Sequence, residues 1–258
     1  MPDSVIVSSI NNILLVTLNR PEKRNALDAE MVDELHGALM DTRDNDAVRV
    51  MVLMATGDAF CAGADLAYLT SLGKASPLEN AADSKRLMEM MLALRTYPKP
   101  VIAQVQGPAL AGGCGLALAC DIVVASETAS FGFPEVRIGF VPAIVTRLLA
   151  ERVGMGTARE MLLRGNVVNA DTAEQLGMIN YVTAAEELTA SVEKLAFEIA
   201  QKVSPQAVRL TKQLLNEISG MDLEQSMRHA AAFNALARST ADFRSGLSAF
   251  LEKRKIVW

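Results

Sequence analysis

The chain has 258 residues, half of them hydrophobic, and a formal net charge of −5. A chain of this length buries a sizeable core and forms one large domain or two small ones. Lysine and arginine are scattered among acidic residues, which argues against nucleic acid as a partner. Residues 1–10 carry an acid where a secretory signal has basic residues, and no apolar run approaches the roughly 20 residues of a membrane span. We therefore expect a cytoplasmic protein without a membrane partner.

Strand and helix patterns alternate in the first half of the chain. Two short strands flank the pair Asn11 and Asn12, and the helix that follows has Asn25 as its candidate cap. Predicted strands cover residues 4–10, 13–19, 48–57, 101–107 and 121–126, and predicted helices cover residues 26–43 and 84–97. This alternation predicts a largely parallel sheet with helices packed outside it.

Helices dominate from about residue 143 onward, and short turns marked by glycine or proline join them. They are predicted over residues 143–154, 156–165, 169–177, 186–203, 205–220 and 222–239. The C-terminal third is therefore expected to be a helical subdomain. Its apolar faces can pack on the core or on another subunit, and a helical tail of this length favours an oligomer.

Cysteine and histidine residues do not form a metal-binding pattern. Cys61, Cys114 and Cys120 contain no C-x-x-C pair and lie in apolar sequence, which favours buried free thiols. His36 and His229 lie far apart on amphipathic helical patterns. No metal site is expected.

Three segments that follow predicted strands carry candidate chemistry: residues 57–69, 110–121 and 130–143. In the first, a glycine-containing turn leads into a helix that is expected to hold Ala64 and Asp65 in its first turn. Glycine-rich turns let the backbone pass close to a bound group, and free N–H groups at a helix start carry a partial positive charge. Two helix starts that face each other can hold one carbonyl oxygen and stabilise an enolate.

The third segment, SFGFPEVRIGFVPA, places Glu135 directly after a proline among apolar and aromatic residues. Partial burial raises the pKa of a carboxyl group and suits it to proton transfer near neutral pH. Each segment also has a purely structural interpretation, in which the glycines allow tight helix-to-strand packing and Glu135 is an exposed turn acid. The combination of all three segments favours a catalytic site.

Five motifs are spread over essentially the whole chain: LNRPEKRNAL (18–27), AFCAGADL (59–66), GPALAGGCGLALACDIVVAS (107–126), FGFPEVRIGFVPA (131–143) and FRSGLSAFLEKRK (243–255). In order and spacing they resemble the enoyl-CoA hydratase/isomerase (crotonase) superfamily. The resemblance implies an α/β fold, the ClpP/crotonase-like spiral of ββα repeats, over residues 1–200. It implies a C-terminal helical trimerisation region over residues 201–258, and a homotrimer or a hexamer of two trimers.

The resemblance also implies an acyl-CoA substrate whose thioester oxygen lies in an oxyanion hole made by the N–H groups of Ala64 and Gly112. It implies no metal and no cofactor, because coenzyme A is part of the substrate. The substrate- and CoA-binding positions implied by the motifs are Lys23, Arg24, Ala62, Ala64, Asp65, Leu66, Gly112, Gly115, Phe133, Pro134 and Pro142. In relatives, a tail like AFLEKRK can reach a neighbouring subunit's CoA, although Ser245 stands where many have glutamate.

Gly115 is where the chain departs from the two-base hydratases of the family. Those relatives have one glutamate three residues after the oxyanion glycine and another in the later Pro–Glu motif. Here Gly115 takes the first position, where it is expected to leave an empty place, and Glu135 takes the second. Three interpretations remain open: a hydratase that uses Glu135 as both base and acid, an enoyl-CoA isomerase that uses it as the single base between C2 and C4, and a non-catalytic acyl-CoA binder.

Residues 142–145, PAIV, resemble methylglutaconyl-CoA hydratase-like members, which favours hydration of a short or branched 2-enoyl-CoA. The helix over 84–97 falls where relatives vary the wall of the acyl pocket, with ordinary core packing as the alternative for Met88, Met90, Met91 and Leu94. Glu89, and less directly Glu79 and Asp83, are candidates for a second acid, with solvated surface acids as the alternative.

Overall fold

The computed structural model describes residues 3–256 and 258. Its strands are β1 (Val5–Ile10), β2 (Ile13–Leu18), β3 (Val50–Ala55), β4 (Val101–Val105), β5 (Ala109–Leu110), β6 (Ile122–Ser126), β7 (Ser130–Gly132), β8 (Val167–Asn169) and β9 (Tyr181–Thr183). Its helices are α1 (Ala29–Thr42), α2 (Leu66–Leu72), α3 (Pro77–Arg95), α4 (Gly112–Ala119), α5 (Thr146–Arg164), α6 (Ala170–Gln175), α7 (Leu188–Lys202), α8 (Pro205–Glu217), α9 (Leu223–Arg238) and α10 (Ala241–Leu251).

The main sheet has the strand order β1-β2-β3-β4-β6-β9. Strand β1 is antiparallel to β2, whereas β2, β3, β4, β6 and β9 run parallel, which confirms the largely parallel core. Asn11 and Asn12 join β1 to β2 with φ angles of 51° and 65°, a left-handed turn that matches the twist of a hairpin. A second small sheet has the order β5-β7-β8.

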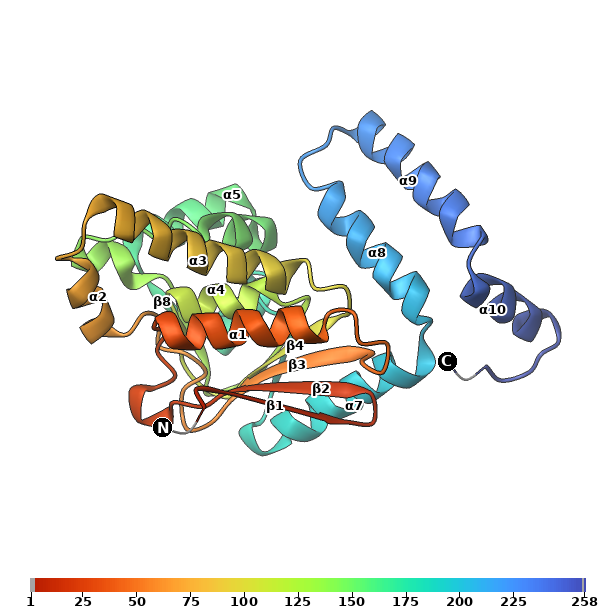
Figure 1. Ribbon diagram of the computed structural model, residues 1–258, viewed down its shortest axis with the longest axis horizontal. Coiled ribbons are helices and arrows are strands. Elements are labelled where there is room, and N and C mark those ends of the chain that lie inside the picture. Colours follow the sequence, from red (N-terminus) through yellow and green to blue (C-terminus); the bar gives the residue numbers. More distant parts are fainter. Residues whose placement is uncertain (1–2, 257) are drawn as a thin grey trace.

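Alternating side chains of the buried strands point to opposite faces of the main sheet. Val50, Val52 and Ile102 pack against α7, while Met51 and Leu53 pack into the larger core. Figure 1 shows α1 and α3 on that other side of the sheet and α7 below it. The parallel strands are therefore covered on both faces, as their near-continuous apolar sequences require.

The structure corrects two local helix predictions, the cap of α1 and the bounds of α3. The cap of α1 is Asp28, whose side chain accepts a hydrogen bond from the Met31 N–H, and not Asn25. Asn25 instead is buried with a φ of 54° and donates to the carbonyl oxygens of Thr56 and Ala59 at 2.8 Å, because it closes two loops on each other. Helix α3 begins at Pro77 after a capping box made by Ser76 and Glu79, so the helix predicted over 84–97 starts earlier and ends sooner.

The helices of the C-terminal third were mostly located by their spacing. The break expected at Gly154 is a kink inside α5, where this residue has a φ of 74°. The strands β5, β7, β8 and β9 were not predicted, because they have only two or three residues each and pair with distant segments. Helix α10 was not predicted either.

Helices α8, α9 and α10 project away from the sheet as an arm (Figure 1). The arm is anchored by buried Lys212 of α8, whose ammonium group donates to the Asp121 carboxylate at 2.6 Å and to the Lys99 carbonyl oxygen at 3.0 Å. Large apolar side chains on the arm remain uncovered, for example Leu223 and Phe250, each 80% exposed. Among the described residues, no helix combines the length and apolar character needed to cross a bilayer.

Candidate active site

Two backbone segments from separate motifs run side by side in parallel. The Cys61 N–H donates to the Pro108 carbonyl oxygen at 3.2 Å, and the Leu110 N–H donates to the Cys61 carbonyl oxygen at 2.9 Å. These bonds pair Cys61 with Ala109. Ala64 and Gly112 each lie three residues beyond that pair, so the two segments bring them next to each other. Gly63 confirms this proximity, because a Cβ at that residue would lie 3.8 Å from the Gly112 nitrogen.

The N–H group of Ala64 points away from Leu27, the residue that pairs with this segment. The Leu27 N–H donates to the Gly63 carbonyl oxygen at 2.7 Å, and the Asp65 N–H donates to the Leu27 carbonyl oxygen at 2.8 Å. In an extended segment the N–H groups of successive residues point to opposite sides, so the Ala64 N–H points away from Leu27. Among the described residues, no acceptor bonds this group or the Gly112 N–H.

The two donors differ in their relation to a helix, since Gly112 begins a helix and Ala64 does not. Gly112 is the first residue of α4, so its N–H is one of the unsatisfied donors of that helix. Ala64 and Asp65 are not in the first turn of a helix, as expected above, because α2 begins at Leu66 with extended Asp65 as its cap. Ala64 is thus held in an isolated β-bridge with Leu27, and only Gly112 lies at a helix N-terminus.

Ala111 sets the direction in which α4 starts. It has φ 51° and ψ −123°, a region that residues with a Cβ rarely adopt and that stores backbone strain. Its N–H donates to the Gly132 carbonyl oxygen at 2.8 Å, and its carbonyl oxygen accepts from the Gly115 N–H at 3.0 Å. These two bonds hold Ala111 in this conformation and turn the chain sharply just before Gly112.

Glu135 lies beside the start of α4. Strand β7 pairs Leu110 with Gly132, and Glu135 follows in the 3-10 turn Pro134–Ile138. Its side chain is almost buried, since the residue is 8% exposed, and among the described residues nothing bonds its Oε2 atom. Burial raises the pKa of this carboxyl group above its ordinary value. Cys114 of α4 is buried as well, and burial raises the pKa of its thiol.

The place beside Gly115 is filled and not empty. A Cβ at this residue would lie 2.3 Å from Val145 Cγ1 and 3.3 Å from Met91 Cε. Gly113 is similarly enclosed, because its Cβ would lie 2.2 Å from the Cys61 carbonyl oxygen. The packing interpretation of the glycines therefore holds for Gly113 and Gly115, while Gly112 lies beside Ala64 and has no acceptor for its N–H among the described residues.

The acids of α3 each have a structural or surface contact in this structure. Glu79 caps α3, and Asp83 accepts a hydrogen bond from the Tyr68 hydroxyl. Glu89 is exposed and pairs with Lys85 at 3.6 Å, so its surface interpretation is correct. Met90, Met91 and Leu94 are buried in the core, whereas Met88 is exposed.

The other motif residues fall into two groups. Lys23 and Arg24 are exposed in a turn that lies against Ala62, whose N–H donates to the Arg24 carbonyl oxygen at 3.0 Å. Leu66 is 74% exposed just beyond Asp65. Pro134 and Pro142 are partly buried, and Phe133 is fully buried in the core, so in this conformation Phe133 has no surface for a ligand.

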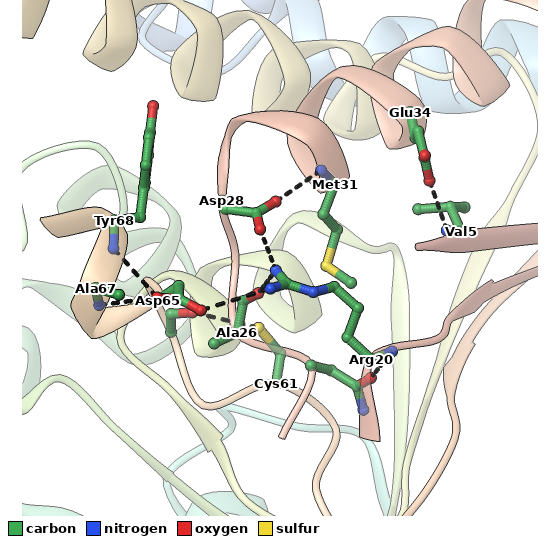
Figure 2. A network of polar contacts seen from close by, with 12 residues as sticks. Val5, Arg20, Ala26, Asp28, Met31, Glu34, Cys61, Asp65, Ala67 and Tyr68 are labelled. Carbon is green, nitrogen blue, oxygen red and sulfur yellow. Dashed lines mark hydrogen bonds and ion pairs between the residues drawn. The ribbon is translucent and has the colours of Figure 1, made fainter. Parts of the chain in front are cut away.

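Two residues near Ala64 were missed from the sequence, Arg20 and Asp28. Figure 2 shows the Arg20 guanidinium group between the carboxylates of Asp28 and Asp65. The arginine within the first motif was the available signal, but sequence separation of eight and forty-five residues hides both contacts.

Two adjacent free N–H groups beside a buried carboxyl group can stabilise negative charge on a carbonyl oxygen while a proton moves nearby. Such an arrangement, on a mostly parallel α/β core, suits an enzyme that acts on a carbonyl compound. Residues 8–258 match the model of the family described as Enoyl-CoA hydratase/isomerase, and the chain belongs to that enzyme family. Its fold is accordingly the crotonase fold.

Known relatives and structures agree with this assignment. The chain is 36% identical to a crotonyl-CoA hydratase of Syntrophomonas wolfei, over 98% of this chain and 96% of that protein. It is also 36% identical to a 2,3-dehydroadipyl-CoA hydratase of Escherichia coli, over 97% of this chain and 96% of that protein. The crystal structure of an enoyl-CoA hydratase from Mycobacterium smegmatis superposes with a TM-score of 0.93 at 33% identity, covering 99% of this chain and 98% of the other.

Proposed function

We propose that the protein is an enoyl-CoA hydratase for a short or branched 2-enoyl-CoA, such as one resembling 3-methylglutaconyl-CoA. The observation that carries the proposal is the unbonded Oε2 of Glu135 close to the start of α4, where Gly112 and neighbouring Ala64 present free N–H groups. Two of the relatives above are named as hydratases of crotonyl-CoA and of 2,3-dehydroadipyl-CoA, which supports hydration as the reaction. The substrate's CoA lies along Lys23, Arg24 and Ala62 in this proposal, and no metal or separate cofactor takes part.

Hydration with a single carboxylate proceeds in two proton movements. The thioester oxygen accepts hydrogen bonds from the N–H groups of Ala64 and Gly112. Ionised Glu135 takes a proton from water while the water oxygen bonds to C3 and the double bond's electrons form an enolate. The two N–H groups bind this enolate more strongly than the ground-state carbonyl. Protonated Glu135 then returns the proton to C2, which completes addition of water on one face.

Isomerisation is the second candidate function, and the packing around Gly115 favours it. Val145 and Met91 place methyl groups beside Gly115, where two-base relatives have a glutamate, so this position supplies no second acid to hold the attacking water. An isomerase needs one base, which removes a proton from C2 of a 3-enoyl-CoA and delivers it to C4. Glu135 and the same two N–H groups are sufficient for that reaction.

Ultraviolet absorbance of the conjugated thioester distinguishes the two functions. With crotonyl-CoA or 3-methylglutaconyl-CoA, a hydratase consumes this absorbance because the double bond is lost. With a 3-enoyl-CoA, an isomerase generates it. Consumption is the result expected from the proposal, whereas generation alone identifies the isomerase. Binding of these esters without either change would identify a non-catalytic acyl-CoA binder.

The raised pKa of Glu135 has a consequence for stability that does not depend on turnover. The folded chain keeps a proton on Glu135 at pH values where the unfolded chain has released it, so stability decreases as pH rises from the ordinary value of 4.5 through the raised value. Glu135→Gln removes this loss. We therefore expect the free energy of unfolding of the variant, minus that of the wild type, to be larger at about pH 8 than at about pH 4. Denaturant unfolding at both pH values measures the difference, and an equal difference at both would contradict burial of the carboxylate.

We further propose that the arm α8–α10 forms the contacts of a homotrimer or homohexamer. Its uncovered apolar residues, such as Leu223 and Phe250, support an interface with further copies of the chain. Light scattering coupled to size-exclusion chromatography is expected to give three or six times the chain mass, and Phe250→Asp is expected to weaken the assembly. A monomer at micromolar concentration would contradict this proposal.

A further inference from the structure

Arg20 connects two helix starts on either side of the Ala64 backbone. It follows β2, and its side chain is only 17% exposed. One guanidinium nitrogen donates to the Ala26 carbonyl oxygen at 3.0 Å and contacts the Asp28 carboxylate. The other terminal nitrogen lies 3.5 Å from Oδ2 of Asp65 (Figure 2). The planar fork of arginine can serve these separate acceptors at once, which a lysine ammonium group does less well.

The two carboxylates divide their oxygens in the same way. Asp28 uses Oδ1 to accept from the Met31 N–H at 3.0 Å, capping α1, and turns Oδ2 to Arg20. Asp65 uses Oδ1 to accept from the Ala67 and Tyr68 N–H groups at 2.8 and 3.1 Å, capping α2, and also turns Oδ2 to Arg20. Arg20 therefore joins the N-terminal ends of α1 and α2 through their caps.

Ala64 lies inside this connection. Leu27, the residue before Asp28, bonds the backbone of Gly63 and Asp65 on either side of Ala64. The position of the Ala64 N–H is thus set by the backbone of Leu27 and Asp65. The carboxylate of Asp28, which follows Leu27, and the carboxylate of Asp65 both contact Arg20. Without the guanidinium group, two partly buried carboxylates would face each other with no shared cation.

We propose that Arg20 is a positioning residue for the reaction: through Asp28 and Asp65 it holds the Ala64 N–H in the direction needed to bind the enolate oxygen. This inference rests on the proposed role of Ala64 as an oxyanion donor. It assigns Arg20 no contact with substrate. Because misplacement of a reacting group by about 1 Å can cost roughly 100-fold in rate, the effect of losing Arg20 is expected in the chemical step.

The test compares Arg20→Gln and Arg20→Lys with the matched control Arg86→Gln. Arg86 also bridges two carboxylates on different helices, Asp33 of α1 at 3.1 Å and Asp83 of α3 at 3.9 Å, but neither of these caps α1 or α2. We expect Arg20→Gln to lower kcat roughly 10- to 100-fold with KM nearly unchanged, because an interaction made in the transition state is lost. Arg20→Lys is expected to lose less, and Arg86→Gln to retain wild-type kcat.

Amide hydrogen exchange over residues 61–68 supplies a readout that does not require turnover. Faster exchange there in folded Arg20→Gln, but not in Arg86→Gln, is expected from the proposal, together with partial recovery of kcat when guanidinium ion is added at low concentration. Wild-type kcat in Arg20→Gln, a raised KM with unchanged kcat, or unchanged exchange over 61–68 would overturn it. If the wild type shows no turnover of enoyl-CoA esters, the proposed function fails, whereas the exchange result still decides whether Arg20 fixes the Ala64 backbone.

Discussion

Glu135→Gln is expected to lower kcat/KM for the preferred enoyl-CoA ester by roughly 10²- to 10⁴-fold, the usual contribution of general acid–base catalysis. The amide keeps the size of the side chain but cannot accept a proton from water or from C2. Among the described residues nothing bonds Oε2 of Glu135, so replacing this oxygen by an amide nitrogen breaks no hydrogen bond. Binding of the ester is therefore expected to persist, which calorimetric titration with a saturated acyl-CoA measures.

Glu127→Gln provides the matched control for this experiment. Glu127 is an exposed glutamate between β6 and β7, and among the described residues its backbone N–H bonds the Thr183 carbonyl oxygen at 2.9 Å while its side chain has no partner. The control variant is expected to retain full turnover. Full turnover by Glu135→Gln would show that another group carries the proton, and equal losses in both variants would point to a general effect of removing negative charge.

Adding a side chain at Gly115 is the second change with a large expected effect. Even an alanine Cβ would lie 2.3 Å from Val145 Cγ1, so Gly115→Ala is expected to lower the free energy of unfolding by about 1–3 kcal/mol through overpacking. Gly115→Glu is expected to be worse, because a buried carboxylate must also find a partner. It is therefore expected to reduce activity and not to supply a second base.

Val145 is the residue that leaves no room for a side chain at position 115. Val145→Gly in the Gly115→Ala or Gly115→Glu background removes the clashing methyl groups, so the double variants are expected to be less destabilised than the sum of the single changes. Urea unfolding of the four members of each cycle measures this coupling. Strict additivity would contradict contact between residues 115 and 145. Hydration that is faster in the double variant with Gly115→Glu than in Val145→Gly alone would show that this site can accommodate two carboxylates.

Sequence pattern was sufficient for the main architecture. The apolar runs of β3, β4 and β6 are continuous because helices cover both faces of the sheet, and helix spacing located most of the C-terminal elements. The N–H donors at Ala64 and Gly112 were placed together only through the family resemblance. Periodicity alone does not predict the parallel pairing of Cys61 with Ala109 that makes them neighbours.

What the sequence did not predict depends on contacts between distant residues. The apparently empty place at Gly115 is filled by Val145, thirty residues away in the chain, and by Met91 from another helix. Asp65 is a cap and not a first-turn residue, since its side-chain oxygen bonds the N–H groups of Ala67 and Tyr68. The bridge from Arg20 to Asp65 likewise exists only after β2 and α2 are brought together by folding.

Mass spectrometry of crotonyl-CoA incubated in water labelled with heavy oxygen tests the central claim most directly. The account predicts that the wild type forms a 3-hydroxyacyl-CoA carrying one heavy oxygen and that Glu135→Gln forms almost none in the same time. Incorporation by Glu135→Gln at the wild-type rate would contradict the assignment of Glu135 as the acid–base group. No incorporation by the wild type, with double-bond migration in a 3-enoyl-CoA, would contradict hydration and establish isomerisation instead.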